Sequence, residues 1–455
     1  MADPRPEPSA PVDTEEMAAG RAAAAYINGL IRGPAGPTQP RAPVHQRRRG
    51  RERLARMRRF LDALGHPQAG LPVVLVAGTS GKGSVAVKIA EGLRAAGYAT
   101  GLHVTPYLQT PLEKFWLDGR LARPGELADL AAWIRPVVER ADPRQPPTYG
   151  MVWVALTFEY FRRARVDALV LEVGAGGRFD LTNVCDPLLN VITTVGMDHE
   201  KSLGPKLADI AWHKAGIARP GVPTVVGGMP APARAVVIDE VHRAGATLIE
   251  AGPTAPDDFR ATNDRLAEAV LDALSARGFA RIDAAAREAA RGSALPGRYE
   301  RMPSPDGPAV ILDGAHNPDK ARALADLWRR ECSPHAGVLV AGTVGYRSPA
   351  AVLAPLWPTV QAWIATEPQV LGKPPTPAAA AAQAGSDAGY PAVAAEPDPL
   401  RALDRALEIC PPGGRVLVAG SLYLAGNIRP RWYPTEEIER QRTMWPLRHT
   451  APDHA

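Results

Sequence analysis

The stretch VVLVAGTSGKGSVAVKIAEGLRAAGY, residues 73–98, limits the fold more than any other part of the sequence. Its first residues form a short, β-branched apolar run, and from Val85 to Ala96 apolar residues recur at helical spacing. A strand that passes through a glycine-rich turn into a helix points backbone N–H groups at one place, where they attract anions. The sequence therefore predicts a phosphate-binding loop.

This loop carries the residue types that phosphate binding requires. Glycines let the backbone approach an anion closely, Lys82 adds a full positive charge, and Ser84 offers a hydroxyl for a magnesium ion. Gly83 separates the lysine from that hydroxyl, which departs from the common Walker A spacing. We expect the whole loop to bind a nucleotide: Gly78, Thr79, Ser80, Gly81, Lys82, Gly83 and Ser84.

Length and composition narrow the class of protein. A chain of 455 residues exceeds one core of usual size, so two domains are expected. Cys185, Cys332 and Cys410 lie far apart, which fits a reducing cytoplasm and predicts neither disulfides nor a structural zinc site. The N-terminus lacks the apolar core of a signal peptide, and no apolar run is long enough to span a bilayer. We expect a cytoplasmic protein without a membrane partner.

Basic residues are concentrated in HQRRRGRERLARMRR, residues 45–59, although the chain as a whole carries a net charge of only +5. Such a run can be a nucleic-acid patch or a solvated helix face. No aromatic residues interleave with it, so we favour the helix face and expect no nucleic-acid partner.

Strands that are continuous apolar runs alternate with helices, which is typical of a parallel sheet covered on both faces. The prediction is an α/β protein. The alternation breaks in the Pro- and Gly-rich segment 290–308 and resumes on a smaller scale beyond it. The expected division is a loosely ordered lead (1–43), a P-loop domain (44–295), a Rossmann-like domain (296–430) and a tail (431–455).

Ligands of open α/β sheets bind where strands end. Glu172 closes an apolar strand that is expected beside the P-loop strand. Asp198 and His199 follow another strand, where an imidazole can ligate a divalent metal and a carboxylate can orient it. Asp313 and His316 stand at the start of a helix in the second domain. These positions extend the predicted site beyond the P-loop.

Motifs at these places occur in a recognisable order. They are VAGTSGKGS, LEVGAGGRFDLTN, GMDH followed by IAWHKAGI, LPGRYE, LDGAHNPDKARAL and GSLYLAGNIR. From about Tyr26 to Arg429 the chain resembles the bifunctional folylpolyglutamate synthase/dihydrofolate synthase family of the Mur ligase superfamily. The resemblance implies a Mur-ligase-like P-loop domain, a C-terminal glutamate-ligase domain, and ATP- and magnesium-dependent amide formation. A carboxylate becomes an acyl phosphate, which the amino group of glutamate then attacks.

The resemblance also implies roles for individual residues. Catalytic roles fall to Lys82, Glu172, His199 and Lys214. One magnesium ion is expected at Ser84, Thr105 and Glu172, and a second at His199 and a carbamylated Lys214. Nucleotide contacts beyond the P-loop are expected from Asn263, Arg298 and Asp313. Acceptor or amino-acid contacts are expected from Thr148, Asp180, Thr182, Asn183 and His316.

Departures from the family pattern cluster where the acceptor is expected. Gly150 and Met151 stand where the family has an aromatic residue and a glutamate, and Leu181 replaces an alanine. We expect a monomer whose partners are small molecules: ATP, L-glutamate and a folate-type acceptor. Two alternatives stay open, namely a ligase for another carboxylate and a P-loop ATPase without ligase activity.

Overall fold

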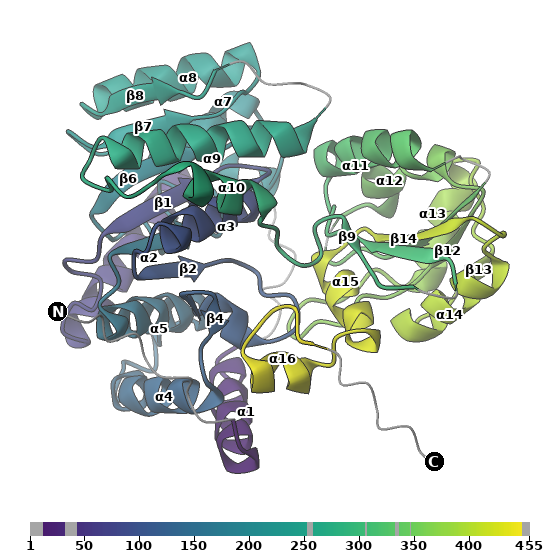
Figure 1. The fold of residues 1–455 in the computed structure, drawn as a ribbon, viewed down its shortest axis with the longest axis horizontal. Coiled ribbons are helices and arrows are strands. Elements are labelled where there is room, and N and C mark those ends of the chain that lie inside the picture. Colours follow the sequence, from purple (N-terminus) through teal and green to yellow (C-terminus); the bar gives the residue numbers. More distant parts are fainter. Residues whose placement is uncertain are drawn as a thin grey trace.

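The computed structural model describes residues 12–31, 43–252, 258–304, 307–332, 336–345 and 347–447. Two sheets dominate it, one in each half of the chain (Figure 1). The strand orders are β4-β3-β2-β5-β1-β6-β7-β8 in the eight-stranded sheet and β13-β12-β11-β14-β10-β9 in the six-stranded sheet. Both sheets are largely parallel, so the predicted α/β fold with a smaller second sheet is confirmed.

The first sheet places the P-loop strand at its centre. β1 pairs in parallel with β5 on one side and β6 on the other, and all of its residues are buried. Only β3 and β4 at one edge run antiparallel. The strands are β1 (Val73–Ala77), β2 (Thr100–His103), β3 (Trp116–Leu117), β4 (Arg120–Leu121), β5 (Ala168–Glu172), β6 (Pro187–Ile192), β7 (Pro223–Val226) and β8 (Thr247–Glu250).

Helices of the first half bury their apolar stripes against this sheet and against one another. The P-loop helix packs on α9 and α10, while α4 packs against both α1 and α5 (Figure 1). The helices are α1 (Thr14–Asn28), α2 (Pro43–Ala63), α3 (Lys82–Ala95), α4 (Pro124–Glu139), α5 (Tyr149–Ala164), α6 (Glu200–Leu203), α7 (Leu207–Ala215), α8 (Ala231–Arg243), α9 (Phe259–Ser275) and α10 (Ala284–Gly292), with a 3-10 turn η1 (Pro111–Lys114).

The second sheet has its own two apolar cores, one on each face. Its strands are β9 (Glu300–Arg301), β10 (Ala309–Leu312), β11 (Gly337–Ala341), β12 (Ala362–Ala365), β13 (Ala394–Ala395) and β14 (Arg415–Ala419). Its helices are α11 (Pro318–Glu331), α12 (Pro349–Leu353), α13 (Ala378–Asp387), α14 (Pro399–Ile409), α15 (Leu422–Ile428) and α16 (Thr435–Gln441), with 3-10 turns η3 (Trp357–Thr359) and η4 (Arg429–Arg431). Among the described helices, none is both long and apolar enough to cross a membrane.

The described parts of the predicted lead and tail, residues 12–31 and 431–447, each contain a helix. Asp13 caps α1, and Arg123 Nε donates to Glu16 Oε1 at 2.8 Å, which ties that helix to the start of α4. Residues 1–11, 32–42 and 448–455 lie outside the described residues. The limits of the four segments stay a prediction, although the boundary near residue 295 does fall between the two sheets.

The segment beyond Arg431 contains α16, which returns to the first half of the protein. Ile438 is fully buried in the first core. The Leu121 N–H donates to Arg442 O, and Arg442 Nε donates back to Leu121 O. Figure 1 shows α16 beside β4 and near α1. A helix of two turns that buries one large side chain shows no apolar repeat, which explains why the sequence predicted a tail without periodicity here.

Truncation of this anchor tests its contribution. We expect Ile438→Ala to lower the free energy of unfolding by about 2–5 kcal/mol, because it leaves a cavity in a closed core. Urea denaturation followed by fluorescence measures the change. The matched control is Leu447→Ala, since Leu447 is 82% exposed and its truncation should cost less than about 0.5 kcal/mol. Equal effects of the two variants would show that α16 is not anchored in the first core.

Candidate active site

The P-loop lies between β1 and the start of α3. It is held by residues that directly follow the neighbouring strand β6. Thr79 Oγ1 exchanges hydrogen bonds with the backbone of Gly196, and Thr193 Oγ1 donates to Ser80 O at 2.6 Å. Gly81 has φ 81°, in the left-handed region, and a Cβ there would lie 2.4 Å from Asn263 Oδ1. The loop is therefore shaped before any ligand binds, and Asn263 of α9 lies against it as expected.

Glu172 is brought to the P-loop by the pairing of parallel strands. In the register of β1 and β5 it stands beside Val76, and its side chain is buried. Lys82 Nζ lies 3.9 Å from Glu172 Oε1, and the backbone N–H of Thr105 donates to Glu172 Oε2 at 2.9 Å. Gly83 approaches the same carboxylate, because a Cβ built on it would lie 3.3 Å from Oε2. The predicted neighbourhood of Lys82, Glu172 and Thr105 is confirmed.

A second group of side chains faces the P-loop lysine from the loop after β6 and from α7. Asp198 Oδ2 lies 3.8 Å from His199 Nε2, and His199 has a left-handed backbone with φ 55°. Lys214 is 2% exposed, and burial, followed by the charge of Lys82, holds its pKa well below the usual value. Burial likewise lowers the pKa of His199, on which the charges of Lys82 and Lys214 also act. The fold thus gathers the predicted Lys82, His199 and Lys214.

The second half contributes the segment after β10. The Asp313 carboxylate accepts from the backbone N–H groups of Tyr299 and Ala315 at 2.8 and 2.7 Å, and burial raises its pKa against the charge of Arg298. Arg298 reaches the same loop, since a Cβ on Gly314 would lie 2.4 Å from its Nη1. The predicted Arg298, Asp313 and His316 therefore lie together.

Two cations that the sequence analysis did not single out complete this cluster. Lys320 Nζ lies 3.2 Å from His316 Nε2, and burial, then the charges of Lys82 and Arg298, lowers its pKa to about 7. Arg347 Nη2 donates to Asp198 Oδ1 at 3.1 Å across the two halves. Lys320 follows His316 by four residues, a spacing that could have indicated from the sequence that the two side chains meet. Arg347 lies in a loop without a local pattern, so the sequence contains no such signal for it.

The predicted acceptor residues lie in the segment after β5 and at the start of α5. Asp180 Oδ1 accepts from Thr182 N and Oγ1, and Oδ2 accepts from Ala175 N. Asn183 bonds the carbonyls of Arg178 and Gly216. These side chains hold their own loop together. A carboxylate has about four acceptor positions, so Asp180 keeps one for a ligand.

Gly150 and Leu181 face each other. A Cβ on Gly150 would lie 3.2 Å from Leu181 Cδ1, closer than ordinary van der Waals contact. Thr148 caps the same helix by accepting from Met151 N at 3.3 Å. Leu181 therefore occupies space next to the position at which the family pattern has an aromatic side chain. Replacing a large–small pair by a small–large pair preserves the packing but changes the shape of the expected acceptor pocket.

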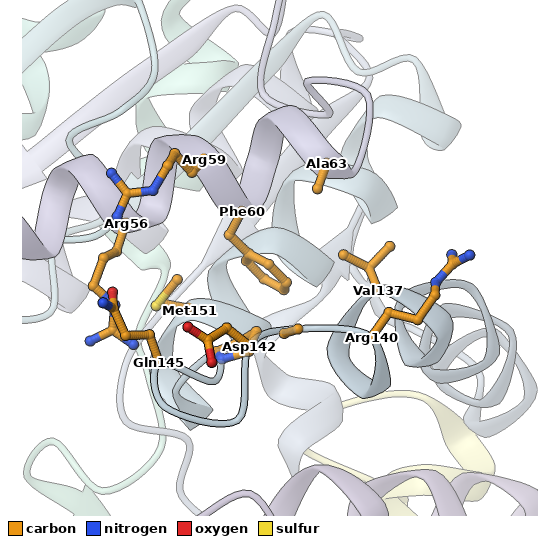
Figure 2. A pocket seen from close by; sticks show the side chains of 11 residues that line it. Arg56, Arg59, Phe60, Ala63, Val137, Arg140, Asp142, Gln145 and Met151 are labelled. Atoms are coloured by element: carbon orange, nitrogen blue, oxygen red, sulfur yellow. The ribbon is translucent and has the colours of Figure 1, made fainter.

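A cavity of about 590 Å³ opens next to Met151, between α2, the end of α4 and the loop that leads to α5 (Figure 2). The Phe60 ring projects into it from α2, and Arg140 and Asp142 line its other side. Arg56 is fixed by donation to Pro146 O at 2.9 Å. This cavity touches the acceptor region only through Met151 and contains none of the P-loop residues.

Known proteins share this arrangement. Residues 297–422 match the family described as Mur ligase, glutamate ligase domain. Dihydrofolate synthase/folylpolyglutamate synthase of Bacillus subtilis is 33% identical over 311 residues, which span 61% of this chain and 72% of the relative.

Solved structures agree along nearly the whole chain. Mycobacterium tuberculosis folylpolyglutamate synthase complexed with ADP is 27% identical, with a TM-score of 0.78, covering 92% of this chain and 99% of that one. E. coli FolC in complex with DHPP and ADP is 26% identical, with a TM-score of 0.73, covering 92% and 98%. With its two sheets, its P-loop and its ordered motifs, the chain belongs to the folylpolyglutamate synthase/dihydrofolate synthase family of the Mur ligase superfamily.

Proposed function

We propose that this protein uses ATP to join L-glutamate to the carboxylate of a folate-type acceptor through an acyl phosphate. The observation that carries the proposal is the meeting of the P-loop Lys82 and Glu172 with lysine side chains from both halves of the chain, Lys214 and Lys320. Relatives named for this activity, and structures described as complexes with ADP, support the nucleotide and the reaction class.

Phosphoryl transfer needs charge neutralisation and alignment more than covalent assistance from the protein. The loop amides and Lys82 bind the β- and γ-phosphates, while the acceptor carboxylate attacks the γ-phosphorus and ADP leaves. Lys320 and Arg298 add positive charge around the transferring group, whereas Lys214 acts as a metal ligand once it is carbamylated. Because Lys320 and Arg298 are partly buried, their interaction with the developing charge is stronger than it is in water.

The second step takes place at the junction of the two halves. The amino group of glutamate attacks the acyl carbon, and inorganic phosphate leaves with the former carboxylate oxygen. Arg347 and Asp319 bring the second half onto the loop after β6, because they bond Asp198 and the N–H of Met197. Closure there excludes water, which would otherwise hydrolyse the acyl phosphate.

Magnesium fits the residues present when phosphate oxygens complete its shell. Among the described residues no group of three or more His, Cys, Asp or Glu side chains gathers to hold a metal by itself. Mg²⁺ usually takes one or two carboxylates together with substrate phosphates and water, and Glu172 beside the P-loop satisfies that pattern. Ser84, Thr105 and Glu172 are proposed for one ion, and His199 with carbamylated Lys214 for a second. Bound there, magnesium neutralises phosphate charge.

Product analysis separates this proposal from its alternatives. Purified protein is incubated with ATP, glutamate and tetrahydrofolate or dihydropteroate, and both ADP and product mass are measured. A folate ligase releases ADP only when both glutamate and the pterin acceptor are present. ADP release without either indicates an ATPase, and amide formation on a pterin-free carboxylate alone indicates the other ligase.

Lys82 and Glu172 are expected to serve turnover and not folding. Replacing either with alanine should lower kcat at least a hundredfold, since each stabilises charge in the transition state, while Tm changes by only a few degrees. The control is Lys206→Ala, an exposed lysine at the start of α7. Near-normal turnover of Lys82→Ala would contradict the assigned role of the P-loop.

Lys214 is expected to be carbamylated. Its lowered pKa increases the fraction of neutral amine, and only the neutral amine reacts with carbon dioxide. Activity should fall in carbon dioxide-free buffer and return with bicarbonate, and Lys214→Ala should be inactive but partly rescued by a short carboxylate. A crystal structure of the nucleotide complex with an unmodified Lys214 amine would refute this.

Gly150 and Leu181 are expected to act as a pair. Gly150→Phe alone should raise the KM for the pterin acceptor and lower Tm, because the new ring collides with Leu181. Adding Leu181→Ala should restore both, with a coupling energy of about 0.5–3 kcal/mol in a double-mutant cycle. Additive effects of the two substitutions would show that they do not share one space.

A further inference from the structure

Lys114 is a buried cation without an ion-pair partner at bonding distance in the described part of the chain. It closes the 3-10 turn η1 and is 5% exposed. Its backbone carbonyl bonds the His103 ring at 3.2 Å, but among the described residues its Nζ forms neither a hydrogen bond nor an ion pair. The adjacent Glu113 directs its carboxylate to the N–H groups of Leu108, Gln109 and Thr110, and its charge acts on Lys114 only after that of Glu172. The buried ammonium therefore lacks a directly bonded counter-charge, which would normally offset its desolvation.

Aromatic rings surround the ammonium. Nζ lies 5.7 Å from the centroid of Tyr107 and 5.8 Å from that of Trp153. Rings attract a cation but leave its N–H groups without acceptors. The indole Nε1–H of Trp153 is also buried, and among the described residues it forms no hydrogen bond of good geometry, its contact with the Tyr149 hydroxyl being too poorly aligned. One cation and one neutral donor thus lie in the same buried place, which is the donor set that a carboxylate requires.

The position of Lys114 relates it to the reacting centre. Of the carboxylates that act on it, Glu172 has the largest influence, and Glu172 is also the neighbour of the P-loop lysine. From the second half, the charge of Lys373 reaches Lys114, and Lys373 Nζ is itself bonded to Tyr423 Oη at 2.6 Å. Burial lowers the pKa of Lys114 only to about 8, so it is mostly cationic at neutral pH. Lys114 therefore presents positive charge near the place where the acceptor carboxylate is phosphorylated.

We propose that Lys114 and the indole N–H of Trp153 bind the α-carboxylate of the acceptor's terminal glutamyl residue while its γ-carboxylate reacts. This inference rests on the proposed function, and it makes Lys114 a residue that favours acceptors already carrying glutamate. The two carboxylates of a glutamyl residue are only a few bonds apart, which matches a cation close to Glu172 but outside the P-loop. An acceptor without that residue leaves the Lys114 ammonium buried and unpaired.

The test compares two acceptors that differ in one group. Tetrahydrofolate is matched with an analogue in which γ-aminobutyrate replaces glutamate, so that the reacting carboxylate is kept and the α-carboxylate is lost. The wild-type protein should prefer tetrahydrofolate by roughly tenfold to a hundredfold in KM, the range expected for a charge-assisted hydrogen bond. Lys114→Met should remove most of that preference with little change in kcat, and Lys114→Arg should keep part of it.

Controls separate a binding role from a structural one. Lys206→Met, at an exposed lysine, should leave the preference unchanged, and thermal unfolding should show that Lys114→Met is folded. The affinity for each acceptor is also measured by calorimetry without ATP. This measurement tests the role of Lys114 in binding independently of whether the proposed reaction occurs. A protein that binds with the stated preference but forms no product overturns the proposed function alone. Equal affinity of the wild-type protein for both acceptors, or an equal loss for both in Lys114→Met, overturns the role of Lys114.

Discussion

Positive charge concentrated where the two halves meet is the constraint on which the site depends. Lys82 is the strongest charged influence that lowers the pKa values of both Lys214 and Lys320, and Asp198 opposes both shifts. Keeping either amine protonated away from water costs several kcal/mol unless a counter-charge lies close. A bound polyphosphate would supply that counter-charge, so we expect nucleotide binding and the contact between the two halves to favour each other.

Contacts away from the reacting centre hold the halves in register. Arg429 is 1% exposed and bonds three segments at once: Glu300 at the edge of the second sheet, Gln109 in the loop after β2, and Met444 O near the chain's end. Removing one partner of a buried charged group is costly because the other is left uncompensated. The segment around α16 therefore works as a strap between the two sheets.

Sequence reasoning succeeded where a local pattern carries the information. Glu172 could be placed beside the P-loop because an apolar strand ends on it and parallel strands share one carboxyl edge. The helical spacing of apolar residues from Val85 to Ala96 likewise predicted the helix that the structure has at Lys82–Ala95. Arg347 and Lys114 could not be found this way, since their roles arise only from which distant segments surround them.

The two ends of the proposed site differ in how far they can vary. At the phosphate end, Gly78 and Gly81 admit no side chain, because a Cβ on Gly78 would lie 1.9 Å from Thr193 Oγ1 and one on Gly81 would meet Asn263. At the acceptor end, the small Gly150 faces the large Leu181, whereas the family pattern has a large residue facing a small one. Such volume-conserving swaps cost little stability. Folding therefore constrains the proposed phosphate-binding loop but leaves the proposed acceptor wall free to change shape. Specificity for the acceptor can diverge in this chain without loss of the ligase chemistry.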